Sequence, residues 1–144
     1  MEYIVIDTRT GPHPTHTNDH IARFLEDHLD QFGDRKEDIL KCLAYVFNVQ
    51  KGGFLVLAVE NGAIGGAVVV NETGMGGYIP ENILVYIAVD RAQRGKGLGK
   101  GLMKAAMEQA KGSIALHVEP DNPAKKLYES LGFTNKYLEM RLHR

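Results

Sequence analysis

The sequence predicts a single α/β domain in which helices flank a central mixed β-sheet. In some segments apolar residues recur at the spacing of a helix, and in others at the spacing of a strand. These segments alternate along the chain, which predicts helices and strands in alternation. A continuous apolar run at residues 83–89 is typical of a central strand that is buried on both faces. The length of 144 residues suits one domain with a sizeable core. We therefore expect residues 1–144 to form one domain.

The first third of the chain predicts one short strand and two helices. Residues 3–7 have strand character, and a polar loop with two prolines follows them. Apolar residues at helical spacing predict a first helix that ends at Gly33, with Asn18 as its N-cap. A second apolar stripe, from Ile39 to Phe47, predicts another helix that stops before Gly52-Gly53.

The remaining elements begin where the period changes from helix to strand. Residues 54–59 and 63–70 are apolar and β-prone, and Asn61-Gly62 between them is typical of a two-residue hairpin turn. A glycine-containing loop at 73–77 precedes the central strand. The later elements that we expect are a helix at 98–110, a strand at 113–118, a helix at 122–130 and one or two strands within 133–142. The crossover between the strands of 83–118 should be right-handed, with the two strands parallel.

Composition argues against several classes of protein. A net charge of −1 gives no general attraction to nucleic acid or to an anionic membrane. The longest apolar run, at 63–70, is far shorter than the ~20 residues that a membrane-spanning helix needs. The first residues lack the pattern of a signal peptide, and the single cysteine, Cys42, fits a reducing compartment. We therefore expect a cytoplasmic protein with neither nucleic-acid nor membrane partners.

Charge is unevenly distributed along the chain. Residues 1–60 contain ten acids and six bases, whereas residues 90–144 contain six acids and eleven bases. The bases are concentrated within 90–104. Such a division suggests two ligands of different charge, although separate solvated faces would produce the same pattern.

A glycine-rich loop carries the strongest chemical signal. It runs from Arg94 to Gly101 as RGKGLGKG, directly after a predicted buried strand and directly before a predicted helix. Such a loop lets the free N–H groups of a helix start approach an anion. The hydroxyl residue of a P-loop is missing, because Gly101 follows Lys100, and the spacing of a dinucleotide-binding loop also fails. The pattern that remains is R-x-x-G-x-G over residues 94–99.

Two blocks together resemble the GCN5-related N-acetyltransferase (GNAT) family. The first is Ile87-Ala88-Val89 followed by the loop of residues 94–99, which is similar to the loop that binds the acetyl-CoA pyrophosphate in that family. The second runs from Asn122-Pro123-Ala124 through Leu127-Tyr128-Glu129 to Leu131-Gly132-Phe133. The two blocks occur in the family's order, and the order of the expected elements resembles the family over nearly the whole chain.

The resemblance implies a mixed sheet flanked by helices and an acetyltransferase that uses acetyl-CoA and an amine acceptor without a metal. Helix-start N–H groups suit a pyrophosphate, and nearby basic side chains would add contacts to phosphate. Asn122 also has the sequence context of a helix cap. The residues expected to bind the cofactor are Ile87, Ala88, Val89, Arg94, Gly95, Lys96, Gly97, Leu98, Gly99, Lys100, Asn122 and Tyr128.

The implied reaction is direct attack of the amine on the thioester within a ternary complex. By resemblance, Tyr128 donates a proton to the departing CoA thiolate, and a tyrosine hydroxyl is protonated at neutral pH. Many relatives carry a glutamate base on the central strand, where this sequence has Ile83. Glu81 lies two residues earlier and is our expected base, with Glu72 or a chain of water molecules as alternatives.

The acceptor and the assembly are less defined by the sequence. Six acids in or near the first two helices could attract a cationic amine: Glu26, Asp27, Asp30, Asp34, Glu37 and Asp38. The acceptor could be a small molecule or a peptide, and the resemblance implies homodimers for many relatives. A non-catalytic acyl-CoA sensor is the alternative function. We expect neither a metal site at His13, His16 and His20 nor a nucleophilic role for Cys42.

Overall fold

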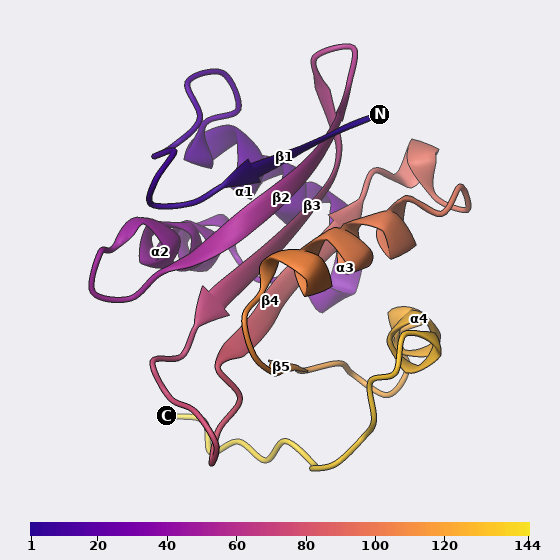
Figure 1. The fold of residues 1–144 in the computed structure, drawn as a ribbon. Coiled ribbons are helices and arrows are strands. Elements are labelled where there is room, and N and C mark those ends of the chain that lie inside the picture. The colour runs from indigo at the N-terminus through magenta and orange to yellow at the C-terminus, as the bar shows by residue number, and fades with distance from the viewer.

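The computed structural model describes residues 1–144 and has a five-stranded sheet with helices on both faces (Figure 1). The strand order in the sheet is the order in the chain, β1-β2-β3-β4-β5. The first four strands pair antiparallel, and β5 lies parallel to β4. The α/β class with a mixed sheet flanked by helices is therefore confirmed.

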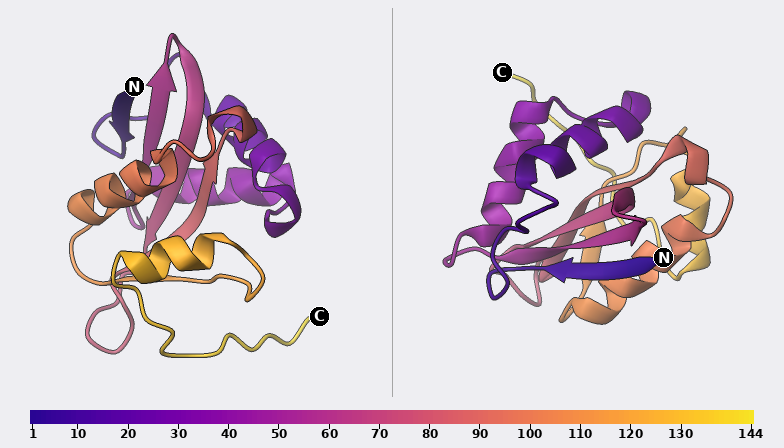
Figure 2. Two further views of the ribbon diagram at one scale, coloured as in Figure 1. Left: turned by 90° about the vertical axis from the view of Figure 1, so that its right-hand side faces the viewer. Right: turned by 90° about the horizontal axis from the view of Figure 1, so that it is seen from above.

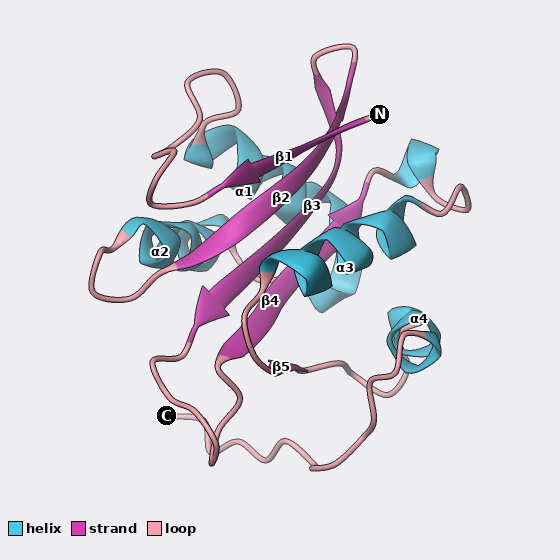
Figure 3. Ribbon diagram, in the orientation of Figure 1, coloured by secondary structure: helices cyan, strands magenta, loops and turns pink.

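The elements divide the chain as follows. The strands are β1 (Glu2–Ile6), β2 (Gly53–Glu60), β3 (Ala63–Glu72), β4 (Asn82–Val89) and β5 (Ile114–Leu116). The α-helices are α1 (Asn18–His28), α2 (Lys36–Phe47), α3 (Leu98–Gln109) and α4 (Ala124–Ser130). Two short 3₁₀ helices, η1 (Asp30–Phe32) and η2 (Arg91–Gln93), follow α1 and β4 (Figure 3). None of the helices has the length and apolar composition of a membrane-spanning helix.

The sheet separates two hydrophobic cores. One core lies between the sheet and α1 with α2, and the other lies between the sheet and α3 with α4 (Figure 2). Strands β2 and β3 are buried over nearly their whole length, which explains their continuous apolar sequences. The turn between them has positive φ at both Asn61 and Gly62, as a two-residue hairpin of this sequence requires.

Strand β4 contains a β-bulge that changes which face its side chains occupy. Val70 pairs with Leu84 and Val69 pairs with Tyr86, so Val85 is an extra residue without a partner on β3. Leu84 therefore packs in the α3 core, whereas Tyr86 packs in the α1–α2 core. Val85 is 36% exposed, which departs from the predicted burial of this strand on both faces.

Strands β4 and β5 pair over a short distance only. Their register runs from Asn82 opposite Ile114 to Leu84 opposite Leu116, and then the strands separate. The predicted strand at 113–118 is thus shorter in the structure. From residue 85 to residue 89, β4 has a neighbour on one side only, β3.

Two sequence predictions need correction. The side chain that caps α1 belongs to Thr17, whose Oγ1 accepts a hydrogen bond from the His20 N–H at 3.2 Å, and Asn18 is the first helical residue. Residues 133–144 form no strand, although strands were expected there. Tyr137, Leu138, Met140 and Leu142 alternate in part with polar residues, but they are 76–90% exposed. A strand needs a neighbouring edge for its backbone hydrogen bonds, and β5 offers only three residues.

Close packing of α3 on β3 depends on a glycine. A Cβ atom at Gly66 would lie 2.6 Å from Leu102 Cδ1 and 3.3 Å from the Ala88 carbonyl oxygen. Leu102 is fully buried, so its side chain has little room to move. At the adjacent Gly65, the nearest atom would be 3.5 Å away, an ordinary contact.

We expect Gly66→Ala to lower the free energy of unfolding by about 1–3 kcal/mol, because the added methyl group overpacks the interface between α3 and the sheet. Gly65→Ala should change it by less than about 0.5 kcal/mol. Urea unfolding of the two variants beside the wild type tests this. Equal stability of the two variants would contradict the packing argument.

Candidate functional site

A cleft of about 300 Å³ opens where β4 and β5 separate. Its walls come from η1 with the end of α1, from the last residues of β4, from the glycine-rich loop with the start of α3, and from α4. Because β4 has no second neighbour here, about half of its backbone N–H and C=O groups lack a partner in the sheet. The cleft therefore combines an apolar floor with open backbone hydrogen-bonding groups.

Most of the residues expected to bind a cofactor meet in this cleft. Ten of them line it: Ile87, Ala88, Val89, Arg94, Gly95, Gly97, Leu98, Gly99, Asn122 and Tyr128. Lys96 and Lys100 do not line it. Lys96 borders an adjacent hollow together with Met1 and Tyr3, and Lys100 is exposed on the first turn of α3.

The glycine-rich loop has a backbone that favours glycine at two positions. Gly95 and Gly97 have φ values of 80° and 81°, and Gly97 is the N-cap of α3. No side chain caps this helix, so the first-turn N–H groups have no partner within the protein. Together with the helix dipole, these donors give the cleft wall a partial positive charge.

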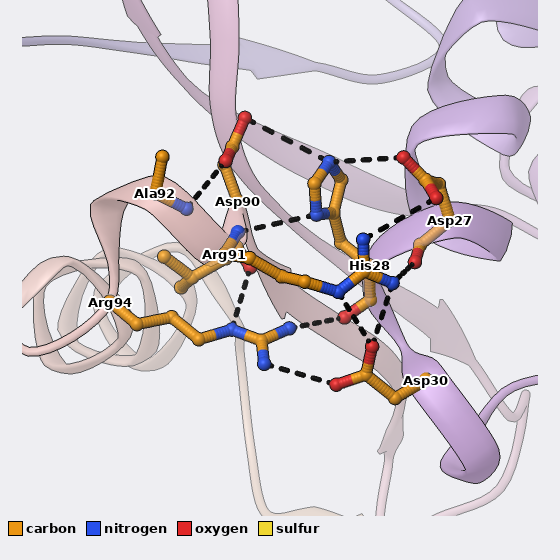
Figure 4. Close-up of polar contacts among 8 residues, drawn as sticks. Asp27, His28, Asp30, Asp90, Arg91, Ala92 and Arg94 are labelled. Carbon is orange, nitrogen blue, oxygen red and sulfur yellow. Dashed lines mark hydrogen bonds and ion pairs between the residues drawn. The ribbon is translucent and has the colours of Figure 1, made fainter.

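Arg94 contacts protein groups instead of facing the cleft as a free cation (Figure 4). Its Nη1 donates to Asp30 Oδ2 at 3.0 Å, its Nη2 to the His28 carbonyl at 2.7 Å, and its Nε to the Val89 carbonyl at 3.1 Å. The guanidinium therefore joins η1 and the end of α1 to the end of β4. Arg94 was expected to contact phosphate, and in the structure its guanidinium joins two walls of the cleft that it lines.

Arg91 reinforces the same junction. Its Nε and Nη2 donate to Asp30 Oδ1 at 3.0 and 2.8 Å, and Nη2 also donates to the Asp27 carbonyl (Figure 4). Hydrogen bonds from Arg91 and then Arg94 lower the pKa of Asp30 below its ordinary value. The backbone N–H of Arg91 donates to His28 Nδ1 at 3.3 Å, which extends the network to the last residue of α1.

Tyr128 lies on α4 at the wall of the cleft. It is 7% exposed, and burial raises the pKa of its hydroxyl to about 12. No protein group forms a hydrogen bond with this hydroxyl. A protonated hydroxyl at a cleft wall is able to donate a proton to a group bound there.

Asn122 shapes the beginning of α4. Its Oδ1 accepts a hydrogen bond from the Ala124 N–H at 2.9 Å, and its carbonyl accepts one from the Lys125 N–H at 3.1 Å. Asn122 also lines the cleft, so one residue both holds the turn before α4 and forms part of the cleft wall.

Glu81, the residue expected to act as a base, does not line the cleft. It precedes the first residue of β4, whereas the cleft begins at Ile87, near the other end of that strand. Its Oε1 accepts a hydrogen bond from the Ser113 N–H at 3.0 Å. The carboxylate thus holds the turn that leads into β5. Glu72, the other carboxylate considered, lies at the same remote end of the sheet and pairs through its backbone with Asn82.

Other reactive side chains lie outside the cleft. Burial raises the pKa of the Cys42 thiol to about 12, and its Sγ lies 3.3 Å from Asn71 Oδ1, so it is a poor nucleophile. His13 Nδ1 accepts hydrogen bonds from the backbone N–H groups of Thr15 and His16, which organises the loop before α1.

Sequence reasoning missed the η1 wall of the cleft. Leu29, Asp30 and Phe32 line it. The sequence predicted Leu29 and Phe32 only as part of the first helix, and Asp30 only as one of six acids that could attract a cationic amine. Asp30 has a φ of 55°, which is unusual for a residue other than glycine and which turns the chain toward the two arginines. The only sequence signal for this wall was the pairing of acids before residue 60 with bases after residue 90.

The sequence was also compared with known protein families and with known proteins. The model of the acetyltransferase (GNAT) family matches residues 13–133. No curated protein matches the chain significantly.

Solved structures share the fold at low sequence identity. An aminoglycoside N-acetyltransferase in complex with CoA is 16% identical, with a TM-score of 0.70, 99% of this chain covered and 93% of the other. A ribosomal-protein-alanine N-acetyltransferase from Brucella melitensis is 17% identical, with a TM-score of 0.63 and coverages of 99% and 98%. An integron cassette protein of V. cholerae is 23% identical, with a TM-score of 0.68 and coverages of 99% and 92%.

We expect Asp30→Asn and Arg94→Gln each to accelerate backbone hydrogen exchange in residues 28–33, because either change breaks the bridge that holds this wall. The double variant should exchange faster than either single variant but by less than the sum of the two effects. Both changes remove the Asp30–Arg94 bond, whereas only Asp30→Asn weakens the bonds to Arg91 and only Arg94→Gln removes the bond to the His28 carbonyl. Arg9→Gln, which breaks a distant ion pair with Asp7, is the control. Independent, additive effects of Asp30 and Arg94 would contradict the shared bridge.

Proposed function

The chain belongs to the GNAT family of acetyltransferases, and we propose that it transfers an acetyl group from acetyl-CoA to a primary amine. The observation that carries this proposal is the position of the uncapped α3 N-terminus beside the open edge of β4, within one cleft. The α3 N-terminus suits the pyrophosphate of CoA, and the open edge of β4 suits its extended amide-containing arm. We also propose that residues 1–144 act as one catalytic domain.

The cleft supports a specific way of holding acetyl-CoA. The pyrophosphate accepts hydrogen bonds from backbone N–H groups of the loop from Gly95 to Gly99, where the helix dipole favours negative charge. Lys96 within this loop and Lys100 directly after it are exposed and add positive charge nearby. The pantetheine arm pairs with the backbone of residues 87–89, and Asn122 and Tyr128 form the opposite wall.

The proposed reaction is a direct transfer in a ternary complex. The neutral amine attacks the thioester carbonyl carbon, a C–N bond forms, and the C–S bond breaks. A backbone N–H on the open edge of β4 stabilises the developing oxyanion. Tyr128 donates its proton to the leaving sulfur and regains one from solvent. No covalent intermediate with the protein is needed.

The acceptor nitrogen must also lose a proton. Asp30 is the only carboxylate residue that lines the cleft, and both of its oxygens accept hydrogen bonds from arginines. We therefore propose that water in the open cleft takes this proton. This replaces the earlier expectation for Glu81, whose carboxylate lies at the far end of β4.

Calorimetric titration with acetyl-CoA and with free CoA tests the cofactor half of the proposal. Release of CoA in the presence of primary amines tests the transfer. Absence of binding to either CoA species would contradict the assignment of the cleft. Binding without transfer to any amine would favour the acyl-CoA sensor.

We expect Tyr128→Phe to reduce kcat by about 100-fold or more, because a general acid contributes about that much to a transfer rate. The affinity for acetyl-CoA should stay close to that of the wild type. The matched control is Tyr137→Phe, since Tyr137 is an exposed tyrosine of the C-terminal segment. An unchanged kcat for Tyr128→Phe would remove this residue from the mechanism.

We expect Gly97→Ala to weaken acetyl-CoA binding by about ten-fold or more, because it disturbs the N–H groups that face the pyrophosphate. Gly77→Ala is a matched control. Both glycines have a φ of 81° and no atom within 4 Å of an added Cβ, but Gly77 lies in the loop before β4. The two variants therefore share the backbone strain, and only Gly97→Ala should lose binding in the titration. Equal affinities would overturn the role of the loop.

A further inference from the structure

A tyrosine and an aspartate form a polar pair beside the cleft. The Tyr86 hydroxyl donates a hydrogen bond to Asp34 Oδ2 at 2.6 Å, a short distance typical of a hydroxyl bonded to a carboxylate. Tyr86 is buried on β4 and packs in the α1–α2 core, whereas Asp34 is exposed in the segment between η1 and α2. Burial, followed by the carboxylate of Asp34, raises the pKa of Tyr86, so its hydroxyl keeps the proton that it donates.

Neither partner lines the cleft, but both lie within two residues in the chain of residues that do. Ile87 follows Tyr86 on β4, and Phe32 lies two residues before Asp34. The hydrogen bond therefore joins β4 to the segment that follows η1, on the side of the sheet covered by α1 and α2. This side lies across the sheet from α3 and α4, which form the other helical layer (Figure 2).

Asp34 has no cationic partner in the protein, unlike Asp30 and Asp38, the aspartates on either side of it in the chain. Asp30 pairs with Arg91 and Arg94, and Asp38 pairs with Arg35 and Lys41. Asp34 makes no ion pair, and its second oxygen, Oδ1, accepts no hydrogen bond. A carboxylate that is held in place by a buried hydroxyl, exposed to solvent and without a counter-charge is well suited to bind a cationic group of a ligand.

We propose that Asp34, held by Tyr86, selects acceptors that carry a second cationic group besides the amine that is acetylated. This inference rests on the proposed acetyl transfer. The Tyr86 side chain points away from α3 and its glycine-rich loop, so its hydroxyl and Asp34 lie a full tyrosine side chain from the β4 backbone. The thioester is proposed to lie along that backbone. Asp34 therefore contacts a group several bonds from the reacting nitrogen, and it acts in specificity rather than in the transfer step.

The substrate class that fits is a diamine or polyamine. One ammonium group binds the Asp34 carboxylate, and the other amine, after losing its proton, reaches the thioester. Tyr86 is a positioning residue, because its hydroxyl fixes the rotamer of Asp34 without contacting the acceptor.

The test compares 1,4-diaminobutane with butylamine, which has the same carbon chain and one amine fewer. For the wild type we expect the KM for the diamine to be about ten-fold lower than the KM for butylamine. Asp34→Asn keeps an acceptor for the Tyr86 hydroxyl but removes the charge, so the KM for the diamine should rise toward that for butylamine. Tyr86→Phe should raise the KM for the diamine by a smaller factor, with kcat maintained.

Asp38→Asn is the matched control, since Asp38 is a nearby acid that already has two cationic partners. It should leave the preference for the diamine intact. A wild type that acetylates both amines with equal KM, or an Asp34→Asn variant that keeps the preference, overturns the role of Asp34 while the transferase function stands.

A second measurement does not depend on turnover. Calorimetric titration of 1,4-diaminobutane into the CoA-saturated protein should show binding in the wild type and about ten-fold weaker binding in Asp34→Asn. Equal or undetectable binding of the diamine in both proteins also overturns the inference. Failure of acetyl-CoA itself to bind would instead contradict the proposed function, so the two failures are distinguishable.

Discussion

The separation of β4 from β5 after three residue pairs is the constraint on which the site depends. A strand in the middle of a sheet normally uses its backbone groups on both sides, and such a strand could not bind an extended ligand through them. Beyond Leu84, β4 has lost that second neighbour, and the bulge at Val85 turns Tyr86 toward the α1–α2 layer. The cleft, the open backbone groups and the position of Tyr86 all follow from these few residues.

Charge pairing holds the cleft open in a defined shape. The acids near the end of α1 and the bases after β4 are far apart in the sequence, yet Asp30 meets Arg91 and Arg94 in the structure. Some of the unevenly distributed charges therefore pair with one another inside the protein, whereas the sequence suggested that they attract two ligands of different charge. Arg94 illustrates the difference, because its three hydrogen bonds connect the walls of the cleft.

Local signals in the sequence predicted those features that depend on local physics. The Asn61-Gly62 turn and the glycine-rich loop require positive φ, so their residues identify them directly. The expected strands within 133–142 failed because a strand depends on a neighbouring edge, and the short length of β5 was not visible in the sequence. The sequence also did not show that Glu81 lies at the opposite end of β4 from the cleft, because this depends on where β4 and β5 separate. The bond between Asp34 and Tyr86 joins residues 52 positions apart, and no local pattern predicts it.

The unpaired stretch of β4 also has a cost for the solubility of the protein. An exposed row of backbone donors and acceptors is a template on which a strand from another molecule can add, and this is a common route to aggregation. Here the row lies at the bottom of a cleft between η1 and α4, so an incoming chain with bulky side chains meets both walls. Both walls therefore obstruct a strand that would otherwise pair with this edge. The same walls that shape the cleft protect the sheet from edge-to-edge association.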